Sequence, residues 1–235
     1  MKNRIGVRTT FATLCLLAAT LAAAAAAGGL ASLTSAESSE GLKAALNQAA
    51  SVAIASLGKP DGFMANPEVR IPLPGKLQKA TKTLKKIGLG KQTDALTLAI
   101  NRAAEAAVPE ARTLFIDSIK QMSVTDAVSI LKGPEDSATR YFRDSMTAKL
   151  TDRFLPVVSK ATAQVQLAQR YNDVAGRASA LGLVDERDAN LDAYVTRKAL
   201  DGLFLTMAKE EAAIRRNPLG QASSLLRKVF GAIAK

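Results

Sequence analysis

Apolar residues recur at helical spacing through most of the chain after residue 34, and this periodicity restricts the fold more than any other feature. Up to residue 57, for example, Leu42, Leu46 and Ala53 fall on one side of a helix. No stretch of useful length alternates apolar and polar residues as a strand would. Alanine carries much of the 48% hydrophobic content, and aromatic residues are only 4%, which favours closely packed helices. We therefore predict an all-α fold.

One long segment, residues 58–74, interrupts this pattern with four prolines and two glycines, which do not suit a helix. Lys59 to Gly62 is typical of a turn, and Ile71 to Pro74 should be extended. Apolar residues such as Phe63 indicate that the segment packs down as a strap across neighbouring helices. The alternative is a lid or a partner-binding loop, since long ordered loops are often functional.

Local end signals divide the rest of the chain into helices. Thr34 and Glu37 have capping-box spacing, and Ser123 and Asn190 are further predicted caps. Helices are predicted up to residue 57 and near residues 75–87, 92–107, 109–121, 124–132, 137–168, 170–181, 190–216 and 219–233. Pro156 should kink or split the helix that contains it. We expect a compact bundle of about eight or nine helices with one long ordered Pro/Gly-rich loop.

The N-terminus has the organisation of a signal peptide. A basic start that contains Lys2, Arg4 and Arg8 precedes an apolar run from residue 11 to 27, which ends in three alanines suited to cleavage. The alternative is an uncleaved membrane anchor. We expect export to the periplasm or beyond, and no integral membrane segment after cleavage. The expected parts are a signal peptide at 1–27, a flexible mature N-terminus at 28–39 and a single helical domain at 40–233.

Cleavage would leave a chain without cysteine, histidine or tryptophan, because Cys15 is the only cysteine and the other two types are absent. Disulfides, thiolate or imidazole metal sites and histidine-dependent catalytic systems are then excluded. We predict no cofactor and no metal. Removing residues 1–27 takes away three of 32 basic residues and none of 21 acidic ones, which leaves a net charge of +8.

Seven basic residues and no acid lie between Val69 and Thr93. On the predicted helix 75–87, apolar residues from Leu77 to Ile87 share a narrow arc that should face the bundle, and most lysines lie opposite. This charged face is either simply solvated or attracted to anionic lipid headgroups or cell-wall polymers. Nucleic acid is not expected, because no aromatic residue lies among the lysines to stack on bases. The candidate surface residues are Lys76, Lys79, Lys82, Lys85 and Lys86.

A second candidate cluster lies on the predicted helix 92–107. Asp94, Asn101 and Glu105 share one face of it, with Arg102 at the edge. These side chains would either bind a polar ligand, with Glu105 available as an acid, or form a structural hydrogen-bond network with a neighbouring element.

The predicted helix 190–216 is apolar around most of its circumference and should be central. Asp201 is therefore predicted to be buried and paired with a cation, either as a structural salt bridge or as part of a binding site. Its candidate partners are Arg140, Arg143, Arg197 and Arg215. The charges at the end of this helix, Glu210, Glu211, Arg215 and Arg216, are predicted to be solvated pairs.

Several segments in combination resemble one bacterial family. They are Gly58–Phe63, Ile71–Pro74, Asn101–Glu105, Tyr141–Arg143, Ala199–Phe204, Glu210–Glu211 and Ile214–Pro218. Over roughly residues 40 to 231 the chain resembles the secreted helical family called domain of unknown function 4197. The resemblance implies export and a helical fold, and it supplies no mechanism. The candidate ligand-binding residues are Asp94, Asn101, Arg102, Glu105, Arg140, Tyr141, Arg143 and Asp201, with no catalytic residue among them.

These patterns favour a non-catalytic binding or structural protein of the cell envelope over an enzyme. The alternative is a carrier of an apolar or anionic lipid, which a continuous apolar cavity would favour and a solid core would oppose. A carboxylate-based cell-wall hydrolase is a weaker alternative. It needs two acids across a cleft, and sugar clefts usually carry aromatic platforms, whereas the chain has no tryptophan and three tyrosines. The sequence does not predict the oligomeric state.

Overall fold

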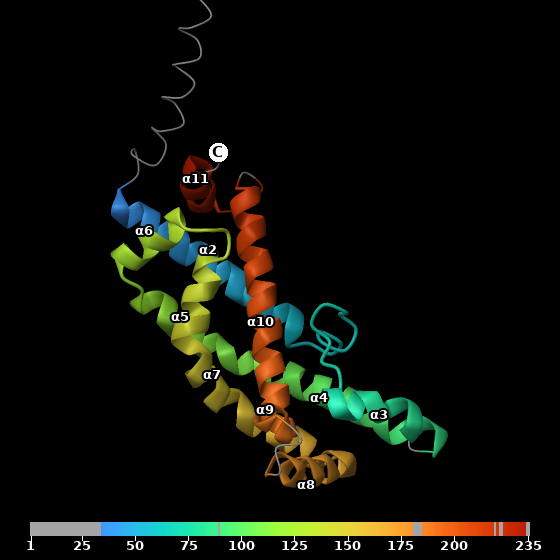
Figure 1. Cartoon of the computed structure of the whole chain (residues 1–235). Helices are drawn as coiled ribbons and strands as arrows, with labels where there is room; N and C mark the ends of the chain where they lie inside the picture. Colours follow the sequence, from blue (N-terminus) through green and yellow to red (C-terminus); the bar gives the residue numbers. More distant parts are fainter. Residues whose placement is uncertain (1–33, 89, 181–184, 219, 221–222, 234–235) are drawn as a thin grey trace, which may run out of the picture.

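The computed structural model describes residues 34–88, 90–180, 185–218, 220 and 223–233 (Figure 1). The predicted signal peptide and the segment 28–33 lie outside these residues. The described part of the chain is helical and contains no strand, which confirms the all-α prediction. Its elements are α2 (Ser35–Leu57), α3 (Gly75–Lys86), α4 (Gly90–Ala107), the 3₁₀ turn η1 (Val108–Glu110), α5 (Ala111–Gln121), α6 (Val124–Lys132), α7 (Ser137–Thr162), α8 (Gln166–Ala180), α9 (Glu186–Ala189), α10 (Leu191–Arg216) and α11 (Ser224–Ile233).

Helix α2 begins where the capping box predicts. Thr34 Oγ1 accepts a hydrogen bond from the Glu37 backbone N–H at 3.1 Å, and the Glu37 carboxylate accepts from the Thr34 N–H at 3.0 Å. Lys228 of α11 forms an ion pair with the same carboxylate at 2.7 Å. Residues 35–39, expected to be flexible, are part of α2, and Ser38 and Ser39 are buried. The helical domain thus starts before residue 40.

Helix α7 continues through Pro156, so the proline does not split it. A proline within a helix removes one hydrogen bond, and its ring crowds the preceding turn, but Phe154 and Val158 on either side are completely buried. Their packing holds the helix in the core as far as Thr162. The break between the predicted helices 137–168 and 170–181 lies at residues 163–165 instead of residue 169.

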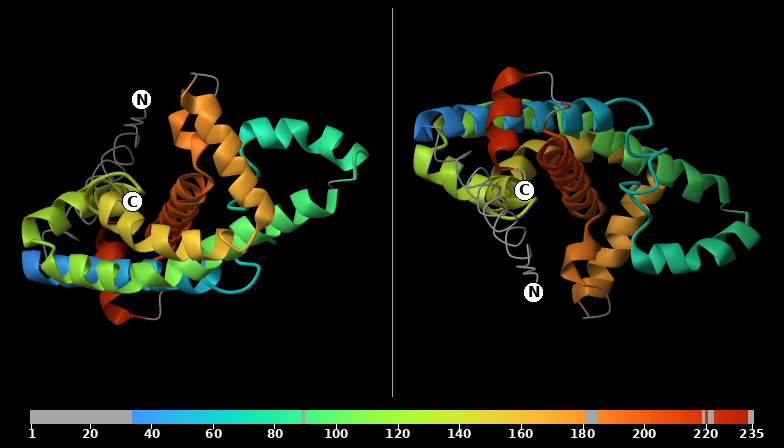
Figure 2. Two further views of the ribbon diagram at one scale, coloured as in Figure 1. Left: turned by 90° about the horizontal axis from the view of Figure 1, so that it is seen from below. Right: turned by 90° about the horizontal axis from the view of Figure 1, so that it is seen from above.

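Helix α10 is the central element. It packs on α2, α4 and α7, and both panels of Figure 2 show it near the middle of the molecule with other helices around it. Phe204 of α10 meets Phe115 of α5 edge-on, with ring centroids 6.4 Å apart, and Phe115 meets Phe142 of α7 at 5.4 Å. These three buried rings join the helices around α10.

Helix α11 closes the bundle against α2. A methyl group at Gly41 would lie 2.4 Å from Val229 Cγ2, so only glycine lets the two helices approach this closely. Leu226 and Phe230 of α11 are also buried. None of the helices within the described ranges is long and apolar enough to span a membrane.

Candidate functional site

Two buried polar side chains of α4 hold the segment 58–74 against the body. Asn101 Oδ1 accepts from the Ile71 N–H at 2.8 Å, and Asn101 Nδ2 donates to the Ile71 carbonyl at 2.9 Å. One turn later, Glu105 Oε1 accepts from the backbone N–H groups of Phe63 and Met64 at 3.0 and 3.1 Å. The segment is a strap whose backbone polar groups find partners on α4.

Arg102 completes this network at the edge of the strap. Its guanidinium donates to the second oxygen of Glu105 at 2.6 Å and to Asp61 at 2.8 Å. Asp61 has a positive φ of 66° at the tip of the turn, so Arg102 stabilises an unfavourable backbone conformation. The hydrogen bond to Glu105 raises the pKa of Arg102 above its ordinary value. Both oxygens of Glu105 are therefore engaged in holding the chain, which supports the structural interpretation of this cluster.

The strap also contacts α10. A methyl group at Gly202 would lie 2.7 Å from the Phe63 ring and 3.3 Å from Val69 Cβ. Phe63 is fully buried, and the Tyr194 hydroxyl donates to the Pro72 carbonyl at 3.0 Å. The strap is thus part of the core and does not have the loose packing of a lid.

The prediction that Asp201 is buried is wrong. Its side chain is 49% exposed and lies 3.7 Å from both Arg143 and Lys198. Although α10 is apolar around most of its circumference, Asp201 and Leu205 lie on an exposed strip that the neighbouring helices leave uncovered. Arg143 also lies over the ring of Phe204 at 5.0 Å.

The buried carboxylate of α10 is Glu211, which was predicted to be solvated. Its oxygens accept from the backbone N–H groups of Ala138 and Thr139 at 3.1 and 3.0 Å and from the Thr139 hydroxyl at 2.9 Å. Arg215, almost equally buried, pairs with it at 3.0 Å. Arg215 also donates to carbonyls at the end of α6. The pair therefore joins the C-terminus of α6 and the N-terminus of α7 to α10.

A sequence signal for Glu211 does exist. Phe204, Met207 and Ile214 are buried on one stripe of α10, and Glu211 continues their helical spacing, four residues after Met207 and three before Ile214. A carboxylate on a core stripe with an arginine one turn later is typical of a buried pair.

The other predicted ligand-binding residues lie outside the network of Asn101, Arg102 and Glu105. Asp94 is 70% exposed and pairs with Lys85 at 3.3 Å, away from Asn101 and Glu105. Arg140 is exposed and pairs with Asp136, the residue that precedes α7. Tyr141 is half-buried, and burial, together with the charge of Asp126, raises its pKa. The eight residues do not form one site.

The basic segment forms a protruding hairpin, which we call the basic hairpin: α3, the turn after it and the first turn of α4, residues 75–94. Helix α3 packs chiefly on α4, and both panels of Figure 2 show the α3–α4 turn at one extremity of the molecule. Lys79, Lys82 and Lys86 are exposed, as is Lys85, which pairs with Asp94. The Lys76 side chain lies outside those that the structure describes.

Ile87 departs from the predicted arrangement of the basic hairpin. It was expected to face the bundle with Leu77, but its side chain is 65% exposed, whereas Leu77 packs against the core. The cause is that α3 ends at Lys86 and the chain turns away at Gly88, whose φ is +85°. The helix therefore ends one residue before Ile87, and Ile87 does not share the face on which Leu77 packs.

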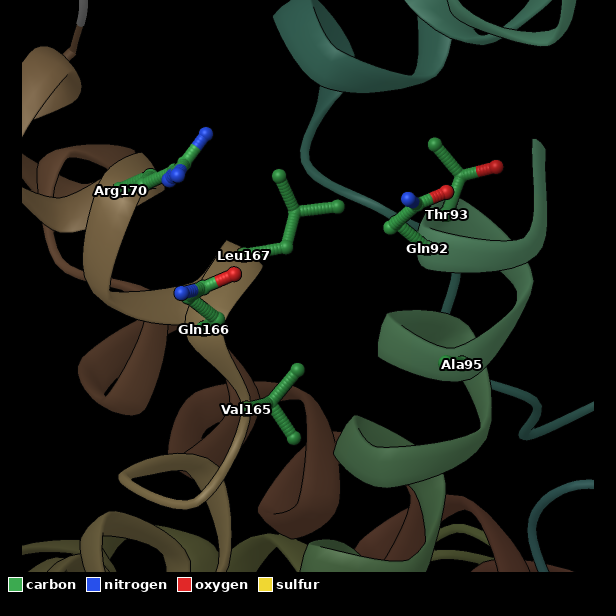
Figure 3. A pocket seen from close by; sticks show the side chains of 7 residues that line it. All are labelled: Gln92, Thr93, Ala95, Val165, Gln166, Leu167 and Arg170. Carbon is green, nitrogen blue, oxygen red and sulfur yellow. The ribbon is translucent and has the colours of Figure 1, made fainter. Parts of the chain in front are cut away.

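A pocket of about 340 Å³ lies between the start of α4 and the start of α8 (Figure 3). Figure 3 shows Leu167 and Val165 directed towards the α4 wall, with Arg170 further along α8. No carboxylate lines it, and Arg170 makes no ion pair with any residue that the structure describes. Its lining residues are Gln92, Thr93, Ala95, Val165, Gln166, Leu167 and Arg170. No local pattern predicts this pocket, because its two walls are about 70 residues apart along the chain.

Comparison with known proteins decides the family. A family model described as a protein of unknown function, DUF4197, matches residues 32–231. The chain belongs to this family. The match begins just before α2 and ends within α11, so it includes the strap, the basic hairpin and the Glu211–Arg215 pair. No curated protein and no solved structure matches the chain.

No cluster of potential metal ligands occurs among the described residues of this DUF4197 protein. Two features of the described residues offer chemistry to a partner: the exposed cations of the basic hairpin and the pocket beside Arg170. Both features include residues from the first turns of α4.

Proposed function

We propose that this DUF4197 protein is a non-catalytic binding protein of the cell envelope that attaches to anionic surfaces through the basic hairpin. The observation that carries this proposal is the exposure of Lys79, Lys82 and Lys86 on a helix that protrudes from the body. The signal-peptide pattern of residues 1–27 supports an envelope location. The net charge of +8 that remains after their removal supports an anionic partner.

The expected binding is weak and reversible. Each lysine close to an anionic membrane contributes about 1 kcal/mol, and the attraction decays over about 8 Å at physiological salt. Lys85 contributes less than the other three, because Asp94 neutralises it at 3.3 Å. Three free lysines would then give binding that is measurable at low salt and lost at high salt.

Vesicle co-sedimentation tests this proposal. The mature chain should sediment with phosphatidylglycerol vesicles at low salt but not with phosphatidylcholine vesicles, and high salt should release it. Replacing Lys79, Lys82 and Lys86 together by glutamine should abolish binding. A matched control replaces Lys120, Lys132 and Lys149, which are exposed on α5, α6 and α7, with the same change in net charge. If both triple variants lose vesicle binding equally, only net charge matters, and the role of the hairpin is refuted.

A second candidate function is the carriage of an anionic single-chain amphiphile in the α4–α8 pocket. Its volume of about 340 Å³ is at the small end of the roughly 300–1,000 Å³ typical of ligand pockets. Val165 and Leu167 would contact the acyl chain, and Arg170 would pair with the head group. The core offers less support for a deep carrier site, since the recess beside Leu42 and Phe230 holds only about 10 Å³.

Dodecanoate titration tests the carrier function separately. Ala95→Phe should fill the pocket and abolish binding of dodecanoate, and Arg170→Gln should weaken it while leaving the hairpin intact. If dodecanoate binds both variants as tightly as it binds the wild type, the pocket is excluded as its binding site. The hydrolase alternative gains no support, because both carboxylate oxygens of Glu105 accept hydrogen bonds from the protein, one from the Phe63 N–H and one from Arg102.

A further inference from the structure

Ile87 has the highest exposure of the large apolar side chains in the described parts of the chain. Its side chain is 65% exposed, and the next highest, Val124, is 46% exposed. Ile87 lies at the turn of the basic hairpin, which is an extremity of the molecule (Figure 2). No atom outside the local chain lies within 4 Å of a methyl group placed on Gly88. The turn therefore stands clear of the body.

The surroundings of Ile87 favour one kind of partner. Lys86 precedes it and Lys91 follows it, both exposed, and the only acid of the hairpin, Asp94, is paired with Lys85 at 3.3 Å. A single exposed apolar residue needs no explanation by itself. An apolar tip surrounded by cations, however, matches the chemistry of an anionic bilayer, in which acyl chains lie beneath charged head groups. A soluble anionic polymer would use the lysines and leave the isoleucine in water.

We propose that Ile87 inserts into the acyl boundary of an anionic bilayer while the surrounding lysines contact the head groups. The inference rests on the proposed function of the basic hairpin and identifies its partner as a lipid bilayer. Burial of an isoleucine side chain in an apolar environment is favourable enough to change affinity by about tenfold or more. Ile87→Ser should therefore weaken binding to phosphatidylglycerol vesicles about tenfold. Its melting temperature should not change, because the residue makes little contact with the core.

Tryptophan fluorescence gives a direct test, because the chain contains no tryptophan. In the Ile87→Trp variant, emission should shift to the blue on addition of phosphatidylglycerol vesicles, and lipids brominated on their acyl chains should quench it. Val124→Trp is the matched control: its site is exposed at the start of α6, and Figure 1 shows α6 far from α3. The emission of this control should not shift on addition of phosphatidylglycerol vesicles, and brominated lipids should not quench it.

The outcomes separate this inference from the proposed function. If Ile87→Trp co-sediments with anionic vesicles in a salt-dependent manner but its emission stays unshifted and unquenched, insertion is refuted and electrostatic attachment stands. If the wild-type chain ignores anionic vesicles at low salt, both ideas fail. Replacing Lys79, Lys82 and Lys86 together by glutamine should abolish the blue shift of Ile87→Trp. This result would support both the insertion and the electrostatic attachment.

Discussion

The buried pair of Glu211 and Arg215 gives the sharpest prediction about stability. Their side chains are 6% and 9% exposed, and Glu211 supplies acceptors for two backbone N–H groups at the start of α7. Replacing Glu211 by alanine removes these acceptors and leaves the Arg215 guanidinium buried without its carboxylate. The perturbation therefore acts on three helices at once, although it removes only one side chain.

The magnitude follows from the cost of breaking a buried pair. Removal of one partner destabilises a protein by roughly 3–5 kcal/mol, because the remaining charge is uncompensated. The unpaired N–H groups add to this cost, and the carbonyls of Ile130 and Leu131 that still accept from Arg215 reduce it. We expect a loss of about 4 kcal/mol. In a domain of this size, each kcal/mol lowers the melting temperature by about 2–4 °C, so a fall of about 8–16 °C is expected.

Thermal unfolding monitored by circular dichroism measures this effect. The matched control is Glu210→Ala, the neighbouring carboxylate, which has no such network and should change stability by less than about 0.5 kcal/mol. Replacing both Glu211 and Arg215 by alanine should be less destabilising than the sum of the two single changes, because no unpaired charge remains. If Glu211→Ala melts within about 2 °C of Glu210→Ala, the pair does not hold the three helices together and the reasoning fails.

Three further predictions address the strap and the N-terminal part of α2. Asn101→Leu should cost about 2–4 kcal/mol, because the Ile71 N–H and carbonyl lose their partners, and trypsin should then cleave residues 58–74 faster; unchanged proteolysis would contradict this. Gly41→Ala should lower the melting temperature through its clash with α11, whereas Gly176→Ala, with open space around it, should stabilise by up to about 1 kcal/mol. Hydrogen bonds from the α11 lysine and from the helix cap lower the pKa of Glu37 from 4.5 to about 2. Its stabilisation should be complete above pH 4.5 and lost as pH falls towards 2, so a melting-temperature gap between wild type and Glu37→Gln that persists at pH 2 would be evidence against it.

Features that depend on a few neighbouring residues were predictable from the sequence. The capping box at Thr34 fixed the start of α2, and Ser123 and Asn190 cap α6 and α10 as predicted. The boundaries of α6 agree with the predicted 124–132. Each of these signals lies within three or four residues, so the chain beyond them has little influence on the result.

Features that depend on which elements meet were not predictable. Asp201 and Glu211 lie on the same apolar helix, and the sequence alone favoured the wrong one as the buried carboxylate. Their burial depends on where α2, α4 and α7 cover α10 and where they leave it open. The network of Asn101 and Glu105 could be recognised as a polar face, but its partners in the strap lie 30 to 42 residues away along the chain.

The sequence by itself determined the helical class, most helix ends and the charge of the basic hairpin, because capping, periodicity and composition act locally. Only the tertiary structure decided that Ile87 projects at the hairpin turn, that Glu211 is a core residue and that a pocket forms beside Arg170. The physical reason is that burial is a property of the assembled helices: a side chain on an apolar helix is buried or exposed according to whether another segment packs over it, and the segments that do so here are distant in sequence.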